Sequence, residues 1–217
     1  MRDKLKTKEY FENFINEEKE RIAKFQVLLN DEKLPEFRKN LISGKCNVIN
    51  LNCLIAKYSK GEDLDILKNE MILINNEWFR FFDPDMYYYN LTFLSLNLLL
   101  GTFDNCVDKI KNLGVKNDWL LNFLIIKEDG EMKLLFPKNY KLLQDSIRNN
   151  NKNGEIKKYL SSWFSHCNFA NFHKSDEKLY FGYWSFEAGA IAKILGIDDS
   201  DLKDEPYYPY DLVHYCD

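Results

Sequence analysis

Apolar residues recur at helical spacing along nearly the whole chain, and this pattern predicts an all-α protein. The first stripe begins with Phe11, Phe14 and Ile15 and continues to Leu29, with the spacing of one helix face. No run of residues alternates as a half-buried strand would, and no hairpin dipeptide stands in a suitable context. The predicted helices cover residues 8–30, 35–61, 63–82, 84–100, 103–113, 117–127, 138–149, 155–168 and 178–195. We therefore expect a compact multi-helix bundle of about nine helices in two packed lobes.

The fourth predicted helix, residues 84–100, lies between the two expected lobes in sequence. It is apolar on most of its sides, which is typical of a central helix, and Gly101 is placed to end it. We divide the chain on this basis into an N-terminal domain, 1–101, and a C-terminal domain, 102–217. No fixed repeat period is found, so a bundle is favoured over a helical solenoid.

One carboxylate interrupts the apolar face of the last predicted helix. At about 100° per residue, Glu187 shares that face with Tyr180, Trp184, Ile191 and Leu195. A buried carboxylate must find hydrogen-bond donors or lose its charge. The favoured interpretation of Glu187 is therefore structural, since no second carboxylate or nucleophile lies at a spacing that catalysis would need.

Two glycines inside predicted helices are expected to mark close approaches between elements. Gly44 interrupts the helix predicted over 35–61, and Gly189 lies in a stripe of small residues in the helix predicted over 178–195. Small residues allow two backbones to approach closely, so both positions predict tight packing.

After the last predicted helix the chain combines acidic residues with tyrosines and two prolines. Residues 197–202 can form a short helical turn, because aspartate and serine suit helix caps. Glu205 and Tyr208 precede prolines and so favour extended geometry. Residues 206–210 are therefore expected to form a stiff, extended strap.

Charge is distributed unevenly along the chain. The net charge is −4, which argues against nonspecific binding to nucleic acid. Residues 198–217 carry seven acidic side chains and one lysine, whereas the rest of the chain has a balance of +2. The negative charge is therefore a local property of the C-terminal segment.

Cysteine usage and hydropathy indicate a reducing compartment. The chain has 5 cysteines, an odd number, and no C-x-x-C pair. No apolar signal region follows the N-terminus, and the longest apolar stretch, 91–100, is too short to span a bilayer. We expect a cytoplasmic protein with no membrane association, either a monomer or a homodimer.

Motifs for catalysis and cofactor binding are missing from the sequence. It contains no phosphate-binding glycine loop, no dinucleotide fingerprint and no nucleophile elbow. His166, His173, Asp176 and Glu187 would supply ligands for a metal-dependent hydrolase only if they converged on one pocket. Their spacing matches no metal motif, so we expect no catalytic residue, no metal and no cofactor.

The C-terminal third of the chain resembles the C-terminal domain of the PoNi immunity proteins. The resemblance rests on an ordered series of segments: 180–188, which reads YFGYWSFEA, then 195–199, 202–204 and 207–212. The N-terminal half, from Arg2 onward, resembles the helical N-terminal domain of the same family more weakly. Residues of the chain that match the family pattern are expected to hold the shared fold: Trp163, His173, Tyr180, Gly182, Tyr183, Trp184, Glu187, Tyr207, Tyr208, Pro209 and Asp211.

The resemblance implies a specific activity. PoNi proteins protect bacteria from PoNe toxins, which are DNases of the PD-(D/E)xK superfamily that are delivered to competitors. The immunity protein would be all-helical, would have no catalysis of its own and would bind its cognate toxin in the cytoplasm. Two other classes stay open: a helical scaffold for a partner other than a nuclease, and the metal-dependent hydrolase described above.

The acidic C-terminal segment is the candidate toxin-binding surface. A DNase needs a basic DNA-binding cleft, and local negative charge would steer an inhibitor towards it. We assign this role to the carboxylates of Asp198, Asp199, Asp201, Asp204 and Glu205.

Overall fold

The computed structural model describes residues 1–81, 83–106, 108–109 and 118–215. Within these residues it contains nine α-helices, four short 3₁₀ turns and no strand, which confirms the all-α prediction. The α-helices are α1 (Lys8–Leu29), α2 (Glu36–Lys60), α3 (Leu64–Trp78), α4 (Tyr87–Leu99), α6 (Trp119–Ile126), α7 (Pro137–Arg148), α8 (Lys152–His166), α9 (Phe186–Leu195) and α10 (Tyr210–Val213).

Most predicted helices occur close to their expected bounds. Of the helix expected over 103–113, the structure describes residues 103–106 and 108–109, which contain a 3₁₀ turn, Phe103–Asn105, and two helical residues. None of the described helices combines the length and the apolar character that a membrane crossing requires.

The chain forms two compact units, each assembled from two stretches of sequence. The first unit comprises residues 1–83 and 171–182, and the second comprises residues 84–170 and 183–217. Both units are thus discontinuous in sequence. The division of the chain into domains at residue 101 stays a prediction, because the units are defined by spatial contacts rather than by a boundary in the sequence.

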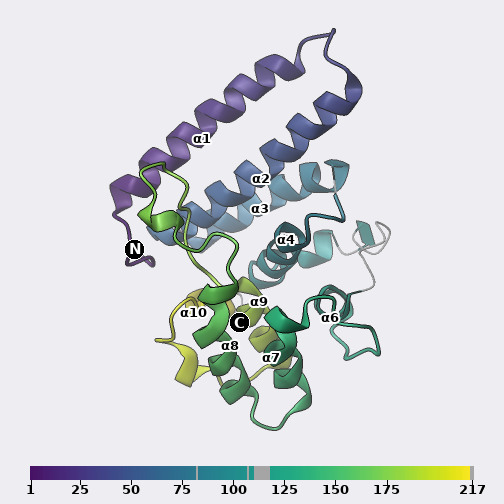
Figure 1. The fold of residues 1–217 in the computed structure, drawn as a ribbon, viewed down its shortest axis with the longest axis vertical. Coiled ribbons are helices and arrows are strands. Elements are labelled where there is room, and N and C mark those ends of the chain that lie inside the picture. The colour runs from purple at the N-terminus through teal and green to yellow at the C-terminus, as the bar shows by residue number, and fades with distance from the viewer. Residues whose placement is uncertain (82, 107, 110–117, 216–217) are drawn as a thin grey trace. The chain divides into compact units, whose positions relative to one another are not determined.

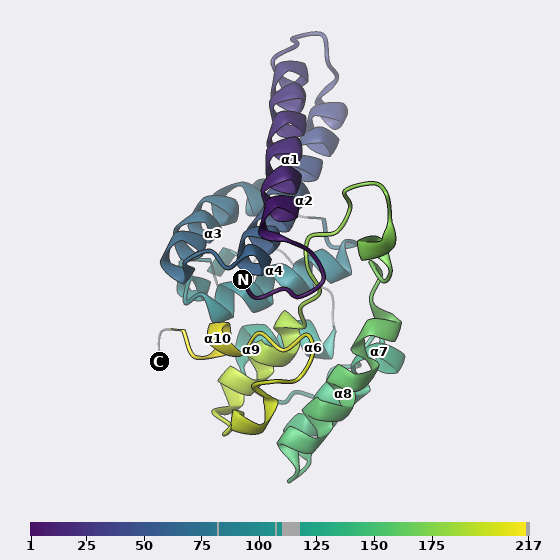
Figure 2. The ribbon, with the colours of Figure 1, turned by 90° about the vertical axis from the view of Figure 1, so that its left-hand side faces the viewer.

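The first unit is built on a hairpin of α1 and α2, which lie side by side in both views (Figures 1 and 2). Phe11, Phe14 and Ile15 of α1 are buried as their spacing predicts. The stretch 171–182 returns to this hairpin far along the chain. There the Tyr180 hydroxyl donates a hydrogen bond to the Asp3 carboxylate.

Helix α4 is the buried element of the second unit. Every residue from 90 to 99 is buried, which agrees with the even apolar character of that stretch. Helix α4 packs against α9 and α6, and α7 lies beside α8 (Figure 2). The expectation of a central helix is therefore met within this unit.

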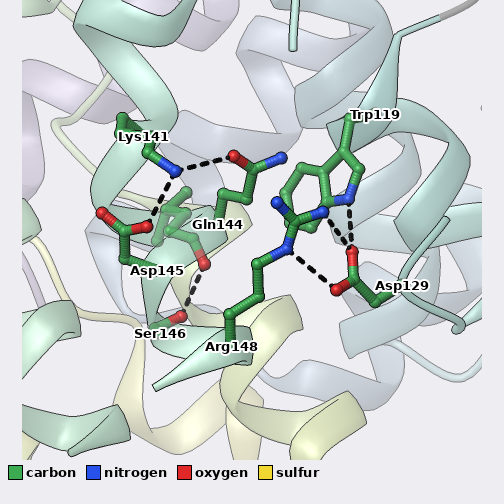
Figure 3. A network of polar contacts seen from close by, with 8 residues as sticks. Trp119, Asp129, Lys141, Gln144, Asp145, Ser146 and Arg148 are labelled. Atoms are coloured by element: carbon green, nitrogen blue, oxygen red, sulfur yellow. Dashed lines mark hydrogen bonds and ion pairs between the residues drawn. The ribbon is translucent and has the colours of Figure 1, made fainter. Parts of the chain in front are cut away.

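A surface network fastens the loop after α6 to α7 in the second unit. Arg148 donates two hydrogen bonds to the Asp129 carboxylate, at 2.9 and 2.8 Å, and the Trp119 indole donates a third at 2.7 Å (Figure 3). The bond from Arg148 is the main cause that holds the pKa of Asp129 below its ordinary value. Since both charges are partly exposed, the network orients the loop more than it stabilises the fold.

The helix predicted over 178–195 begins only at Phe186, and this expectation was wrong for its first turns. Residues 179–185 are not helical, and Gly182 has a φ of 123°, a conformation that favours glycine. The backbone N–H of Ser185 donates a hydrogen bond to the Tyr207 carbonyl at 2.8 Å, so this N–H is not used in a helical hydrogen bond. Tyr180 and Trp184 therefore do not share a helix face with Glu187.

The two helical glycines differ in their surroundings. A Cβ at Gly189 would lie 2.8 Å from Pro209 Cγ and 3.1 Å from Val213 Cγ2, so α9 meets the C-terminal segment closely there. A Cβ at Gly44 would meet no atom within 4 Å, so the close approach expected at that position is not present.

This difference predicts opposite effects of the same substitution. Gly189→Ala should lower the free energy of unfolding by about 1–2 kcal/mol, because the rigid proline ring must shift. Gly44→Ala should raise it by about 0.5–1 kcal/mol through better helix propensity. Urea denaturation of the two variants beside the wild-type protein measures both, and a stabilised Gly189→Ala protein would contradict the packing described here.

Candidate functional site

Glu187 is one of the buried carboxylates of the second unit. The residue is only 6% exposed, and three side chains donate hydrogen bonds to its carboxylate. The Tyr159 hydroxyl lies 2.5 Å, the Trp163 indole nitrogen 2.7 Å and the Ser185 hydroxyl 3.0 Å from the same oxygen, Oε1. The expected structural role of Glu187 is thereby given specific partners.

Two elements position these donors. Tyr159 and Trp163 are four residues apart on α8 and share its buried face with Ile156 and Leu160. Ser185 is the N-cap residue of α9, and Glu187 follows in the first turn of that helix. The carboxylate thus joins the buried face of α8 to the start of α9.

Burial raises the pKa of Glu187 above its ordinary value of 4.5, and the hydrogen bonds from its donors offset part of this effect. No described lysine, arginine or histidine forms an ion pair with the carboxylate. Burial therefore disfavours the charged form of Glu187, and no ion pair within the described residues offsets this effect.

The Glu187 side chain lines a small cleft in the second unit. The cleft has a volume of about 30 Å³, and four aromatic side chains line it: Tyr88, Tyr140, Tyr159 and Trp163. Burial raises the pKa of each of the three tyrosines, and it raises that of the neighbouring Cys167 thiol to about 11. These hydroxyl groups and the thiol are therefore uncharged at neutral pH, which leaves Glu187 as the acidic group of the cleft.

Asp199 differs from the other carboxylates of the proposed toxin-binding set, because it is buried. It is 2% exposed, accepts a hydrogen bond from the Tyr208 hydroxyl at 2.6 Å and lies 2.8 Å from His214 Nε2. In this position it ties the C-terminal segment together and does not present a free charge to a partner.

The other four acids lie at the surface of the second unit. Asp198, Asp201 and Asp204 are exposed, and Glu205 is half-buried with Lys157 Nζ 3.5 Å away. Asp198 is held in place through its backbone, since Asn153 donates to its carbonyl at 2.6 Å. We call Asp198, Asp201, Asp204 and Glu205 the acidic patch. Its assignment as a toxin-binding surface stays a prediction.

The expected strap also contains a turn. Tyr207 has a φ of 68°, and its ring stacks near Trp163 and Phe164, with centroids 5.0 and 5.9 Å away. Pro209 is buried against Gly189 of α9. The tyrosines and prolines thus pack the C-terminal segment onto α8 and α9.

The remaining residues of the family pattern are divided between the two units. His173 and Tyr180 lie in the first unit, where their rings meet edge to face, and Gly182 is buried at the end of the same stretch. Tyr183, Trp184 and Asp211 lie in the second unit, and the Tyr183 hydroxyl donates to the Phe169 carbonyl at 3.0 Å.

Residues proposed for a metal-dependent hydrolase do not form a metal site in the described structure. No group of three histidine, cysteine or carboxylate side chains suited to a metal ion occurs among the described residues. His166 lines the cleft of Glu187, whereas His173 and Asp176 belong to the other unit.

Sequence reasoning did not find the cleft or identify any of the three donors of Glu187, and it named Trp163 only as a residue of the family pattern. Tyr159 and Trp163 at a spacing of four residues on an apolar helix face were a usable signal for paired donors. Tyr88 and Tyr140 carried no such signal, because only the packing of α4 and α7 brings them to Glu187.

The fold places the chain among known all-α proteins. The crystal structure of protein PA2201 from Pseudomonas aeruginosa is similar, with a TM-score of 0.64 and 17% sequence identity. The similarity covers 82% of this chain and 75% of that one, and at this identity it shows a shared fold alone. A comparison with curated proteins found no match.

Two protein-family models match this chain. The model of the N-terminal region of PoNe immunity proteins (PoNi) matches residues 2–112, and the model of their C-terminal region matches residues 116–212. The chain therefore belongs to the family of PoNe immunity proteins, as its C-terminal motifs predict.

Proposed function

We propose that the chain binds a cognate PoNe-type DNase toxin in the bacterial cytoplasm and neutralises it by occluding its DNA-binding surface or active site. Membership of the immunity family supports a toxin as the partner and inhibition without catalysis as the activity. The observation that supports the occlusion mechanism is the acidic patch, whose carboxylates stay largely accessible in a segment otherwise packed onto the fold.

Electrostatics favours this mode of inhibition. A DNase holds phosphates with lysine and arginine side chains, so its DNA-binding cleft has a positive potential. Several carboxylates on one surface accelerate the encounter with such a cleft and, once docked, exclude the phosphates of DNA. The patch needs no bound metal or cofactor for this role.

Plasmid cleavage tests the proposal directly. We expect the nuclease domain of the cognate toxin to lose cleavage activity in proportion to added immunity protein, with complete loss near equimolar amounts and a stable complex on gel filtration. A noncognate nuclease serves as the control and should remain active. Undiminished cleavage at a large excess, with no complex formed, would contradict the proposal.

A second function, that of a helical scaffold for another partner, has one observation in its favour. Val27 and Leu28 near the end of α1, and Phe37 and Leu41 near the start of α2, are 48–72% exposed. They lie at the end of the hairpin where α1 connects to α2 (Figure 1). Exposed apolar side chains of this kind are found at protein interfaces. The scaffold interpretation would take precedence if the cleavage test failed.

A further inference from the structure

We propose that the cleft above Glu187 is a binding site for a primary ammonium group, supplied by a lysine side chain of the partner toxin. The inference rests on the proposed function for the source of the lysine. The chemistry of the site is argued separately from the geometry of the second unit.

The charge of the cleft selects a cation. Tyr159, Trp163 and Ser185 all donate to Oε1 of Glu187, and none of them donates to Oε2. The carboxylate lines the cleft together with His166, and among the described residues no lysine, arginine or histidine forms an ion pair with it. A ligand that brings a positive charge with N–H donors would therefore complete both the charge and the hydrogen bonding of Glu187.

The aromatic walls select the same kind of ligand. Tyr88, Tyr140, Tyr159 and Trp163 line the cleft together with the carboxylate, and aromatic rings attract cations through the negative potential of their faces. The methylene groups of a lysine stem pack against such rings while the charged end reaches deeper. An anion would be repelled by the charge of Glu187, and a neutral ligand would leave that charge uncompensated.

The size of the cleft distinguishes among cations. Its volume of about 30 Å³ accommodates about two water-sized groups. An ammonium group with its terminal methylene is of that size, whereas a planar guanidinium or a tetramethylammonium ion is larger. A lysine ammonium is also a compact point charge with three donors, which suits approach to a single carboxylate oxygen.

A lysine bound in this cleft would contribute to neutralisation in two ways. It would anchor the complex through a charge pair largely removed from water, and it would take from the nuclease a side chain of the kind that contacts DNA phosphates. The cleft would then serve as a specific anchor, while the acidic patch provides long-range attraction.

Nuclear magnetic resonance of the free immunity protein tests the chemistry of the site without the toxin. We expect n-butylammonium chloride to shift the indole N–H resonance of Trp163 in a saturable manner, because that N–H donates to Glu187. Tetramethylammonium chloride at the same ionic strength should not shift it. The Trp119 indole, which donates to Asp129, is the internal control.

Two variants make the titration specific. Glu187→Gln retains an oxygen for the three donors and removes the charge, so it should abolish the shift. Asn168→Trp places a bulky ring at the exposed edge of the cleft without altering a donor of Glu187, so it should also block the probe. Absence of a Trp163 shift in the wild-type protein, or an equal shift in Glu187→Gln, would overturn the ammonium site.

Affinity measurements with the toxin identify the source of the ammonium. Glu187→Gln should weaken the complex by about tenfold or more, as expected for loss of a buried charge pair. Reductive dimethylation of the toxin's lysines keeps their charge but enlarges them, and it should weaken binding to the wild-type protein much more than to Glu187→Gln. Equal effects of methylation on both proteins would overturn the lysine assignment. Failure of any complex to form would contradict the proposed function instead, and the titration with n-butylammonium would still decide the chemistry of the site.

Discussion

Replacing Glu187 with leucine should lower the free energy of unfolding by about 3–5 kcal/mol. The substitution leaves three buried donors, the Tyr159 hydroxyl, the Trp163 indole N–H and the Ser185 hydroxyl, without their common acceptor. Each buried donor without a partner costs about 1–3 kcal/mol, and a network that shares one acceptor is lost as a whole. The gain from a more apolar side chain does not offset this loss.

Glu187→Gln is the matched control for this prediction. The amide oxygen can accept the same hydrogen bonds, and the side chain has nearly the same volume. We expect it to retain the fold with a loss of less than about 1 kcal/mol. Denaturation by urea, followed by linear extrapolation, compares the three proteins. If leucine and glutamine had equal effects, the network around Oε1 would not be what stabilises this region.

The same pair of proteins should show a defined dependence on pH. Because burial raises the pKa of Glu187 in the folded state above its ordinary value of 4.5, the folded protein holds this proton more tightly than the unfolded chain. The stability of the wild-type protein relative to Glu187→Gln should therefore be highest below pH 4.5 and fall as the pH rises through the folded pKa. If the stability of the wild-type protein relative to Glu187→Gln increased with pH instead, an unrecognised cation would have to stabilise the carboxylate.

Reversal of charge in the acidic patch should have the largest effect on toxin binding. Changing Asp198, Asp201, Asp204 and Glu205 to lysine should slow association with the toxin by about tenfold to a thousandfold at low salt. It should also weaken or invert the decrease of the association rate with added salt, because that decrease reports the attraction between patch and cleft. Stopped-flow or surface-based kinetics at several salt concentrations measures both effects.

A second quadruple variant separates local charge from net charge. In this control, lysine replaces four exposed carboxylates outside the patch: Glu20, Glu32, Glu128 and Glu131. Both variants change the net charge of the chain from −4 to +4. We expect this control to slow association much less. Equal rates for the two variants would remove the acidic patch from the interface and would leave net charge as the cause. The Asp199 carboxylate is not included, since its loss would disturb Tyr208 and the fold.

Prediction from the sequence was most successful for helices whose own apolar spacing was sufficient to define them. The stripe of Phe11, Phe14 and Ile15 was sufficient for α1, and the apolar run after residue 90 was sufficient for a buried α4. Prediction failed at residues 179–185, where the apolar spacing also fits a helix but Gly182 and the bond from Ser185 to Tyr207 hold the backbone otherwise. Helical periodicity describes local geometry only and does not show that a distant segment competes for the same N–H.

For the candidate site, the sequence by itself determined the chemistry of single residues. It predicted that Glu187 is a carboxylate that must find hydrogen-bond donors, and it showed that the negative charge is concentrated after residue 197. The family assignment also followed from the order of motifs along the chain, and the family models confirm it.

Only the tertiary structure decided how these residues act together. In the folded protein Tyr159, Trp163 and Ser185 are the donors to Glu187, and Tyr88 and Tyr140 line the same cleft. Asp199 is buried, whereas Asp198 is exposed. The physical reason is that burial and hydrogen bonding depend on which segments meet in space. Asp198 and Asp199 are neighbours in the sequence with the same side chain, yet one is exposed and the other is buried. No local sequence pattern distinguishes them.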